Sequence, residues 1–155
     1  MKIGLIADTH DNLRNLEKAV KLFNAKKVSL VLHAGDYVAP FTIKIFDKLK
    51  SRYLGVFGNN DGETTGLYKK SGGRIKKGPI KLVKEGKKIA LVHDLNSFNC
   101  KNFDVVIFGH SHKKELFKKG KTLVINPGEC GGWLSNKATV AILDTGNLSV
   151  RFFNL

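Results

Sequence analysis

Five short apolar runs in this chain each lead into residues that can bind a metal ion, and this repeated pattern constrains the fold most. Each run has four or five residues and no polar face, which is typical of a strand covered on both sides in a parallel sheet. In open α/β sheets, ligands collect where the strands end. The runs and the residues that follow them are Ile3–Ala7 with Asp8-Thr9-His10, Val28–Leu32 with Gly35-Asp36, Tyr53–Phe57 with Gly58-Asn59-Asn60-Asp61, Ile89–Val92 with His93-Asp94, and Val105–Phe108 with Gly109-His110-Ser111-His112.

Asp36 stands at the centre of this pattern, and we interpret its carboxylate as a bridge between metal ions. Taken alone, a glycine-aspartate pair after a strand would be more typical of a turn or a helix cap. The other runs change this interpretation, because Asp8 and His10 are two residues apart, and so are His110 and His112. Alternate residues of an extended segment point the same way, so each pair can bind one ion.

The length and composition indicate one domain, residues 1–155, with a single hydrophobic core. The hydrophobic content is 42%, but the longest apolar runs stop at about five or six residues and are too short to cross a bilayer. Residues 3–7 already form the first expected strand, which leaves no signal-peptide core. We therefore expect a cytoplasmic protein without a membrane partner. Cys100 and Cys130 have no disulfide, metal or nucleophile pattern and are expected to be structural thiols.

The charge balance points towards anionic partners. The chain has 27 lysines and arginines against 13 aspartates and glutamates, which gives a net charge of +14. The basic residues crowd into segments 69–88 and 113–121, and the second segment directly follows His112. Such a cluster can raise the potential around a phosphate-binding site. A solvated basic surface is the alternative. Nucleic-acid binding is not favoured, because the chain lacks an RGG run, a helix-turn-helix pattern and an aromatic RNA-binding motif.

Helical patterns between the apolar runs define an α/β fold. Apolar residues repeat at helical spacing within residues 12–26, and a second helix is expected from about Pro40 with Phe41 on its buried side. Strands and helices that alternate with short connections imply parallel pairing and right-handed crossovers. Residues 62–79 are basic and glycine-bearing, so they are expected to form a loop, a short helix or a lid. Residues 94–102 are expected to form a short helix.

The second half of the chain has hairpin signals instead. Tight turns are expected at Glu85-Gly86, at Gly120 and at Thr145-Gly146-Asn147, each between two runs with strand character. The sequence has no fixed-period repeat and no low-complexity tract. The expected chain therefore begins with strand-helix units and ends with hairpins.

The ordered set of five motifs resembles the signature of the calcineurin-like metallophosphoesterases, and it spans nearly the whole chain. The small size and the segment Asn126-Pro127-Gly128-Glu129 resemble the compact bacterial and archaeal phosphodiesterase branch of that superfamily. The resemblance implies a four-layer α/β/β/α sandwich of two mixed β-sheets flanked by helices. It also implies two divalent metal ions with seven ligands: Asp8, His10 and His112 for one ion, Asn59, His93 and His110 for the other, and Asp36 as the bridge.

Each implied role suits the chemistry of the residue. Imidazole and oxygen ligands together fit Mn²⁺, Ni²⁺, Fe²⁺ or Zn²⁺ better than Mg²⁺ or Ca²⁺, and manganese is our first expectation. Two carboxylates beside two divalent cations leave about two positive charges, which favours an anionic phosphate. A hydroxide that bridges ions roughly 3.5 to 4 Å apart would attack phosphorus in line. The implied enzyme is a metal-dependent phosphodiesterase that acts on small or nucleotide-like phosphodiesters.

Asn60 and Asp61 are expected to assist the reaction without binding metal. Many members of the superfamily have a histidine at the position of Asn60, thought to protonate the leaving group, and asparagine cannot donate as a titratable acid. Asp61 is expected to orient metal-bound imidazoles by accepting hydrogen bonds. Asp94 stands where glycine is more common, which leaves the geometry of the His93 loop open.

Several other polar and aromatic residues have structural interpretations. His33 is expected to be a core residue or to support a ligand, and Asp11 is expected to cap a helix. Trp133, Tyr37 and Phe41 are interpreted mainly as packing residues. Tyr37 follows Asp36 closely enough to line the mouth of the site.

Two other classes of function stay open. A eukaryotic retromer subunit resembles the same fold and serves mainly in interactions, so a non-catalytic metal-binding scaffold is one alternative. All seven expected ligand positions are filled, which argues for metal binding without proving turnover. A nuclease or nucleic-acid binder would use the lysine clusters and would show strong salt dependence. The oligomeric state is open, with a homodimer as one expectation.

Overall fold

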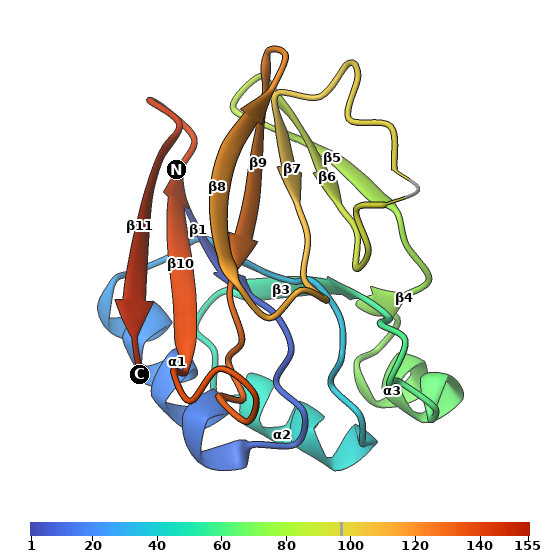
Figure 1. Cartoon of the computed structure of the whole chain (residues 1–155). Coiled ribbons are helices and arrows are strands. Elements are labelled where there is room, and N and C mark those ends of the chain that lie inside the picture. The colour runs from blue at the N-terminus through green and yellow to red at the C-terminus, as the bar shows by residue number, and fades with distance from the viewer. Residues whose placement is uncertain (97) are drawn as a thin grey trace.

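A computed structural model describes residues 1–96 and 98–155 of the chain, which form two mixed β-sheets (Figure 1). The strands of the first sheet are β1 (Lys2–Ile6), β2 (Leu30–His33), β3 (Arg52–Val56), β4 (Ile75–Lys76), β10 (Thr139–Asp144) and β11 (Ser149–Asn154). The strands of the second sheet are β5 (Ile80–Lys84), β6 (Lys87–Leu91), β7 (Val105–Ile107), β8 (Lys114–Lys119) and β9 (Thr122–Pro127). The first sheet has the order β11-β10-β1-β2-β3-β4 and the second β5-β6-β7-β9-β8.

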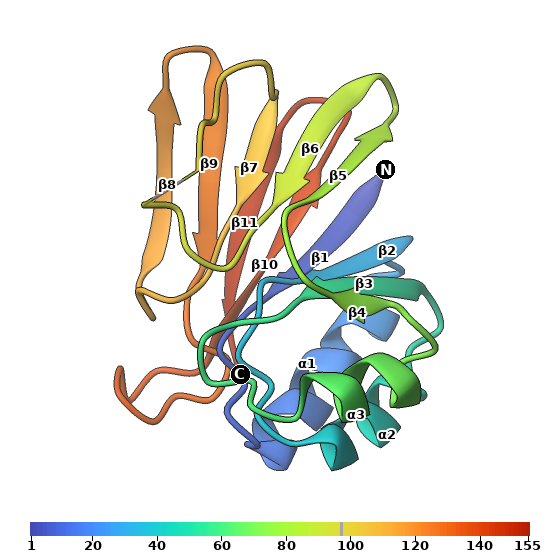
Figure 2. The same ribbon diagram turned by 90° about the vertical axis from the view of Figure 1, so that its right-hand side faces the viewer.

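The two sheets pack against each other and enclose a hydrophobic core (Figure 2). Alternate residues of a strand face opposite sides, so Ile3 and Leu5 of β1 enter this core beside Ile89 and Ile107 of the second sheet. Ile6 faces the other way, into the core beneath the helices. β1 is therefore buried on both faces, as its unbroken apolar sequence predicted. The expected α/β fold with two mixed sheets and flanking helices is confirmed, but all described helices pack on the first sheet, so the second helical layer of the expected α/β/β/α sandwich is not found in the described residues.

Helices cover the outer face of the first sheet (Figure 2). They are α1 (Leu13–Ala25), the 3₁₀ turn η1 (Pro40–Thr42), α2 (Ile43–Phe46) and α3 (Thr64–Lys70). The short-helix alternative for residues 62–79 is thus correct for α3. Among the described helices, none combines the length and apolar character needed to cross a membrane.

Two details of the helical layer differ from the sequence predictions. Asn12 caps α1, because its side chain accepts a hydrogen bond from Asn15 N at 3.2 Å. The prediction of Asp11 as the cap was wrong; its carboxylate accepts from Ala39 N at 3.0 Å and joins two loops. Phe41 was expected in the core, but it is 48% exposed because the segment turns through η1 into only four residues of α2.

The outer face of the second sheet is covered by the segment 94–102, which forms no helix in its described residues. Phe98 packs there against the apolar face of the sheet. The helix expected over this segment is therefore absent from the described part, and residue 97 lies outside it. The side chains of Asp94 and Asn99 each accept the amide two residues further on, at 2.9 Å. Such local bonds compete with the helical pattern.

Parallel pairing brings the ends of six strands to one side of the sandwich. β1, β2 and β3 run parallel in the first sheet, and β6, β7 and β9 run parallel in the second. The segments that follow these strands are joined within a sheet by Gly109 N to His93 O at 3.0 Å, and between sheets by Cys130 N to Ala7 O at 3.0 Å. The C-terminal hairpin β10–β11 completes the first sheet, with β10 antiparallel to β1.

Candidate metal centre

The structure brings all seven predicted metal ligands together at this common end of the two sheets. Three of the parallel strands of the first sheet and two of the second each contribute the residues that follow them. The ligands and their preceding strands are Asp8 and His10 after β1, Asp36 after β2, Asn59 after β3, His93 after β6, and His110 and His112 after β7.

Four of these residues form a compact donor group. Asp8, His10, Asp36 and His112 each offer one donor atom, and these atoms lie within 4.8 Å of one another. Within residues 1–96 and 98–155, Asp8 Oδ2 and His10 Nε2 are buried without a hydrogen-bond partner. A buried polar atom without a partner costs about 1–3 kcal/mol, and a coordinated cation would satisfy both atoms. The group therefore fits a metal ion.

A second donor group adjoins the first. Asn59 Oδ1 lies 2.8 Å from His93 Nε2 and 2.9 Å from His110 Nδ1. Asp36 Oδ2 lies 3.6 Å from His93 Nε2 and 3.5 Å from His10 Nε2, so one carboxylate oxygen faces both groups. His93 Nδ1 lies 2.7 Å from the carbonyl oxygen of Ala34. A proton on Nδ1 would leave the Nε2 lone pair directed into the site.

The backbone at the ligands is conformationally strained. Residues other than glycine rarely adopt positive φ, which costs on the order of 1 kcal/mol or more per residue. This strain persists only where the surrounding structure enforces it, and it is typical of ligand-binding loops. Five of the seven ligands have positive φ: Asp8 (51°), His10 (41°), Asp36 (61°), His110 (67°) and His112 (58°).

Burial controls the protonation of the first donor group. The pKa of Asp8 is raised to about 8, mainly by loss of solvent; the hydrogen bond from His110 N opposes this rise, and the nearby Asp36 carboxylate adds to it. Burial lowers the pKa of His10, which favours the neutral imidazole that metals require. Two buried carboxylates are therefore unfavourable together without a cation beside them.

Asn60 contacts the central carboxylate directly. Its side-chain amide donates to Asp36 Oδ2 at 2.7 Å, and its backbone N–H donates to Asp36 Oδ1 at 2.9 Å. Gly58 lies close by, where a Cβ atom would collide with Asp36 Oδ1. The loop after β3 therefore wraps around the Asp36 side chain.

Asp61 orients the loop after β2 and not an imidazole. Its carboxylate accepts the backbone N–H groups of Asp36 at 3.1 Å, of Tyr37 and Val38 at 2.7 Å each, and of Gly58 at 2.8 Å. Asp61 was expected to accept hydrogen bonds from metal-bound histidines, and this was wrong, because its donors are backbone amides. Hydrogen bonds from four backbone amides satisfy the buried Asp61 carboxylate, which explains how it can be buried here.

Glu129 belongs to the segment 126–129 noted in the sequence, but the sequence reasoning gave this residue no role at the site. It is fully buried, and its Oε1 lies 3.3 Å from His112 Nδ1. Burial opposes its ionised form, but hydrogen bonds from Ser135, Leu134 and Trp133 outweigh this and lower its pKa. Glu129 is the only charged residue in the segment 122–136, a signal that could have indicated its role.

Other predicted roles are resolved by burial. His33 is fully buried, with Nε2 3.2 Å from Thr9 Oγ1, so the core interpretation is confirmed. Tyr37 is also fully buried and does not line the mouth. Trp133 is 62% exposed, and the packing interpretation was wrong: its Nε1 donates to His10 O at 3.0 Å. Asp94 is exposed and forms a local turn.

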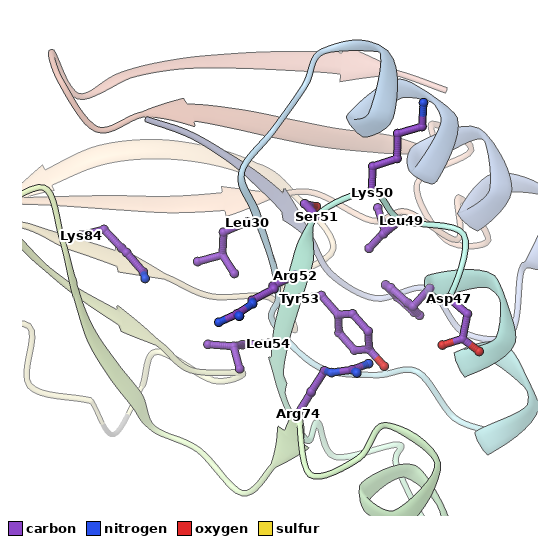
Figure 3. A pocket seen from close by; sticks show the side chains of 11 residues that line it. Leu30, Asp47, Leu49, Lys50, Ser51, Arg52, Tyr53, Leu54, Arg74 and Lys84 are labelled. Atoms are coloured by element: carbon purple, nitrogen blue, oxygen red, sulfur yellow. The ribbon is translucent and has the colours of Figure 1, made fainter.

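Two cavities lie at opposite ends of the first sheet. One of about 460 Å³ opens over the metal donors, between Asp36 and Leu134. A larger one, of about 690 Å³, lies where β2 and β3 begin (Figure 3). It is lined by Arg52, Arg74 and Lys84 and contains none of the predicted metal ligands. The chemistry of the lining, and not the volume, identifies the first cavity as the candidate site.

Comparisons with known proteins agree with this geometry. Residues 1–148 match the model of the calcineurin-like phosphoesterase superfamily domain. The chain belongs to this superfamily. A phosphodiesterase of Methanocaldococcus jannaschii is 37% identical over 161 residues, which cover 97% of this chain and 97% of that protein. The family predicted from the five motifs is therefore confirmed.

Solved structures of other proteins have the same fold. The structure of an archaeal phosphodiesterase superposes with a TM-score of 0.92 at 36% identity and covers 100% of both chains. Vps29 from Chaetomium thermophilum superposes with a TM-score of 0.74 at 17% identity, over 100% of this chain and 95% of that one. At that identity the likeness concerns the fold alone.

Proposed function

We propose that the chain is a metal-dependent phosphodiesterase that hydrolyses small or nucleotide-like phosphodiesters with two divalent metal ions. The observation that supports this most is that seven donor residues from five strand ends form two adjoining groups that share Asp36. The 37% identical phosphodiesterase of Methanocaldococcus jannaschii supports the class of reaction.

The predicted ligands would hold the two ions in separate groups, and other residues would act on the substrate. Asp8, His10 and His112 would hold one ion, and Asn59, His93 and His110 the other, with Asp36 between them. When bound, the two ions would neutralise charge on the phosphate and activate water near neutral pH. The amide of Asn60 can donate a hydrogen bond towards this site but cannot transfer a proton. Lys113 lines the cavity and adds positive potential at its mouth.

Metal removal and add-back test this function. The purified protein is stripped with a chelator, and Mn²⁺, Ni²⁺, Fe²⁺, Zn²⁺ and Mg²⁺ are returned separately. Turnover of bis-(p-nitrophenyl) phosphate and of p-nitrophenyl phosphate is measured beside the number of bound ions. We expect two ions per chain and diester turnover with the transition metals, manganese first. Two bound ions without turnover of either ester would favour the scaffold alternative.

The leaving group should control the rate because Asn60 is no acid. Diesters with stable aryloxide leaving groups should react far faster than alkyl diesters, since general acid catalysis is worth about 10² to 10⁴ in rate. Asn60→His should narrow this gap. Rates are measured across a series of leaving-group pKa values, with metal content checked in both proteins. A flat dependence in the wild type would mean that another group already donates the proton.

The location, the oligomeric state and nucleic-acid binding are separate predictions. A cytoplasmic location and a homodimer stay predictions. Binding to nucleic acid stays the less favoured alternative, and it would appear as a steep loss of affinity with salt for DNA or RNA oligonucleotides. A shallow salt dependence, together with turnover of small diesters, would support the small-substrate function.

A further inference from the structure

Two large apolar side chains stand exposed beside the metal donors. Trp133 is 62% exposed and Leu134 is 75% exposed, the highest value among the exposed large hydrophobic residues described. Leu134 lines the same cavity as Asn60, His110 and His112. Apolar surface in water costs about 25 cal/mol per Å², so an exposed apolar pair at the mouth of a site suggests contact with a ligand.

The loop that carries this pair is fixed to the segments that carry the metal ligands. On one side, Gly131 N donates to Asp8 O at 2.9 Å, and Trp133 Nε1 donates to His10 O at 3.0 Å. The side chains of Asn12 and Asn15 both donate to Gly131 O, at 2.7 and 3.0 Å. These bonds hold the loop against the segment that follows β1.

On the other side, Glu129 holds the loop. Its carboxylate accepts the backbone N–H groups of Trp133 at 2.8 Å, Leu134 at 3.1 Å and Ser135 at 2.9 Å, and the same carboxylate faces His112 Nδ1. One buried group therefore holds the backbone of the exposed apolar pair and lies 3.3 Å from a predicted metal ligand. The pair has a fixed place relative to the metal donors.

From this arrangement we infer that Trp133 and Leu134 bind an aromatic ester group of the phosphodiester, such as an aryl ring or a nucleobase, while its phosphate lies at the metal donors. This inference rests on the proposed function, because it assigns part of the same substrate. An indole offers a flat face for stacking, and Leu134 offers an apolar side wall. The phosphate would bind at the metal donors in the cavity that Leu134 lines, and the ring would lie between Leu134 and the neighbouring exposed indole of Trp133.

A pair of small ligands tests this inference without turnover. Phenylphosphonate and methylphosphonate present similar anions, and only the first carries a ring. Their affinities for the metal-loaded protein are measured by calorimetry, and again as competitive inhibitors of aryl diester hydrolysis. We expect the wild type to bind phenylphosphonate about 10-fold more tightly, and Leu134→Ser and Trp133→Ala each to reduce this preference about 3-fold or more. Affinity for methylphosphonate should stay within about 2-fold.

Matched variants separate the ring contact from other effects. Trp133→Phe removes the hydrogen bond to His10 O but keeps a ring, so it should retain most of the preference. Val83→Ser alters a 63% exposed apolar residue of β5 away from this cavity and should leave the preference unchanged. A wild type that binds both ligands equally would overturn the inference, as would a Val83→Ser effect equal to that of Leu134→Ser.

The outcomes distinguish this inference from the proposed function. If the wild type hydrolyses aryl diesters but both loop variants keep its ring preference, the loop assignment fails alone. If no metal restores hydrolysis, the proposed function fails, and the calorimetric preference still decides whether the loop binds rings. A dimer that dissociates in Leu134→Ser, with an unchanged ring preference, would assign the pair to a subunit contact and overturn the inference.

Discussion

The two ends of the first sheet show how differently one layer of strands can be used. Where β1, β2 and β3 end, buried carboxylates lie beside half-buried imidazoles on a strained backbone. Where β2 and β3 begin, a larger cavity is lined by Arg52, Arg74 and Lys84 and by one carboxylate, Asp47 (Figure 3). The first end concentrates predicted metal donors, whereas the second places cationic side chains around apolar residues such as Leu30 and Leu54.

Buried hydroxyl groups without a partner occur at the second end too, at Ser51 and Tyr53, so backbone strain and the ionisable character of the buried donors distinguish the candidate metal end better than volume does. Asp8 Oδ2 and His10 Nε2 would be costly to leave buried without a cation, so their position requires an explanation. Arg74 at the other end already stacks on the Tyr53 ring, with its guanidinium 5.1 Å from the ring centroid. Substitutions at the two ends should therefore have very unequal effects.

The largest effect is expected from Asp36→Ala. Asp36 Oδ2 faces both donor groups, so its loss should empty both metal positions and abolish turnover, whereas His112→Ala should mainly weaken one position. Metal content per chain, measured by mass spectrometry after dialysis, compares the two variants. Two tightly bound ions in Asp36→Ala would show that this carboxylate is not the bridge.

Glu129→Gln should have the next largest effect. Removal of the charge beside His112 Nδ1 should weaken metal binding about 10- to 100-fold, as is typical for groups that orient a metal-bound histidine. Ser135→Ala is the matched control, because it removes one hydrogen bond to Glu129 and leaves the carboxylate in place. Calorimetric titration of both variants with manganese measures the change. Equal affinities in the two variants would contradict a specific role for the Glu129 charge.

Asp8→Asn should stabilise the metal-free protein while weakening metal binding. The pKa of Asp8 is raised to about 8 in the folded chain, so the folded state holds this proton more tightly than the unfolded state. The stabilisation is present below about pH 4 and is lost as the pH rises towards 8. At pH 8 with chelator, Asp8→Asn should therefore melt several degrees above the wild type. Thermal unfolding between pH 5 and pH 8 measures this, and a Tm difference that stays constant with pH would contradict the shift.

The smallest effect concerns the lysines at the mouth. Lys113→Gln with Lys114→Gln should raise KM about 2- to 5-fold at low salt, with less effect at 0.15 M salt. Arg52→Gln with Lys84→Gln removes the same charge at the opposite end of the sheet and should change KM less. Unchanged KM in the first double variant at low salt would favour a solvated surface without a role in attraction.

Much of the fold follows from local patterns. The unbroken apolar runs indicated buried parallel strands, and each is found in the structure with polar ligands after it. The turn at Glu85-Gly86 joins β5 and β6 as expected. A short helix was expected over segment 94–102, but its described residues form none, and the side chains of Asp94 and Asn99 accept local backbone hydrogen bonds instead. Predictions from local patterns thus fail where side chains accept backbone hydrogen bonds that a helix would otherwise use.

The sequence by itself indicated the superfamily, because the five motifs follow the strands in the order of its signature, and that resemblance supplied the predicted set of seven metal ligands. Only the tertiary structure decided which groups touch. Glu129 reaches His112 across 17 positions of the sequence, and the amide of Asn60 reaches Asp36 across 24. The number of residues between two side chains does not say how far apart they lie or which way they point when they follow different strands. The register of the sheet and the loops after the strands fix both the distance and the orientation. Only the tertiary structure places the exposed pair Trp133 and Leu134 beside the predicted metal ligands.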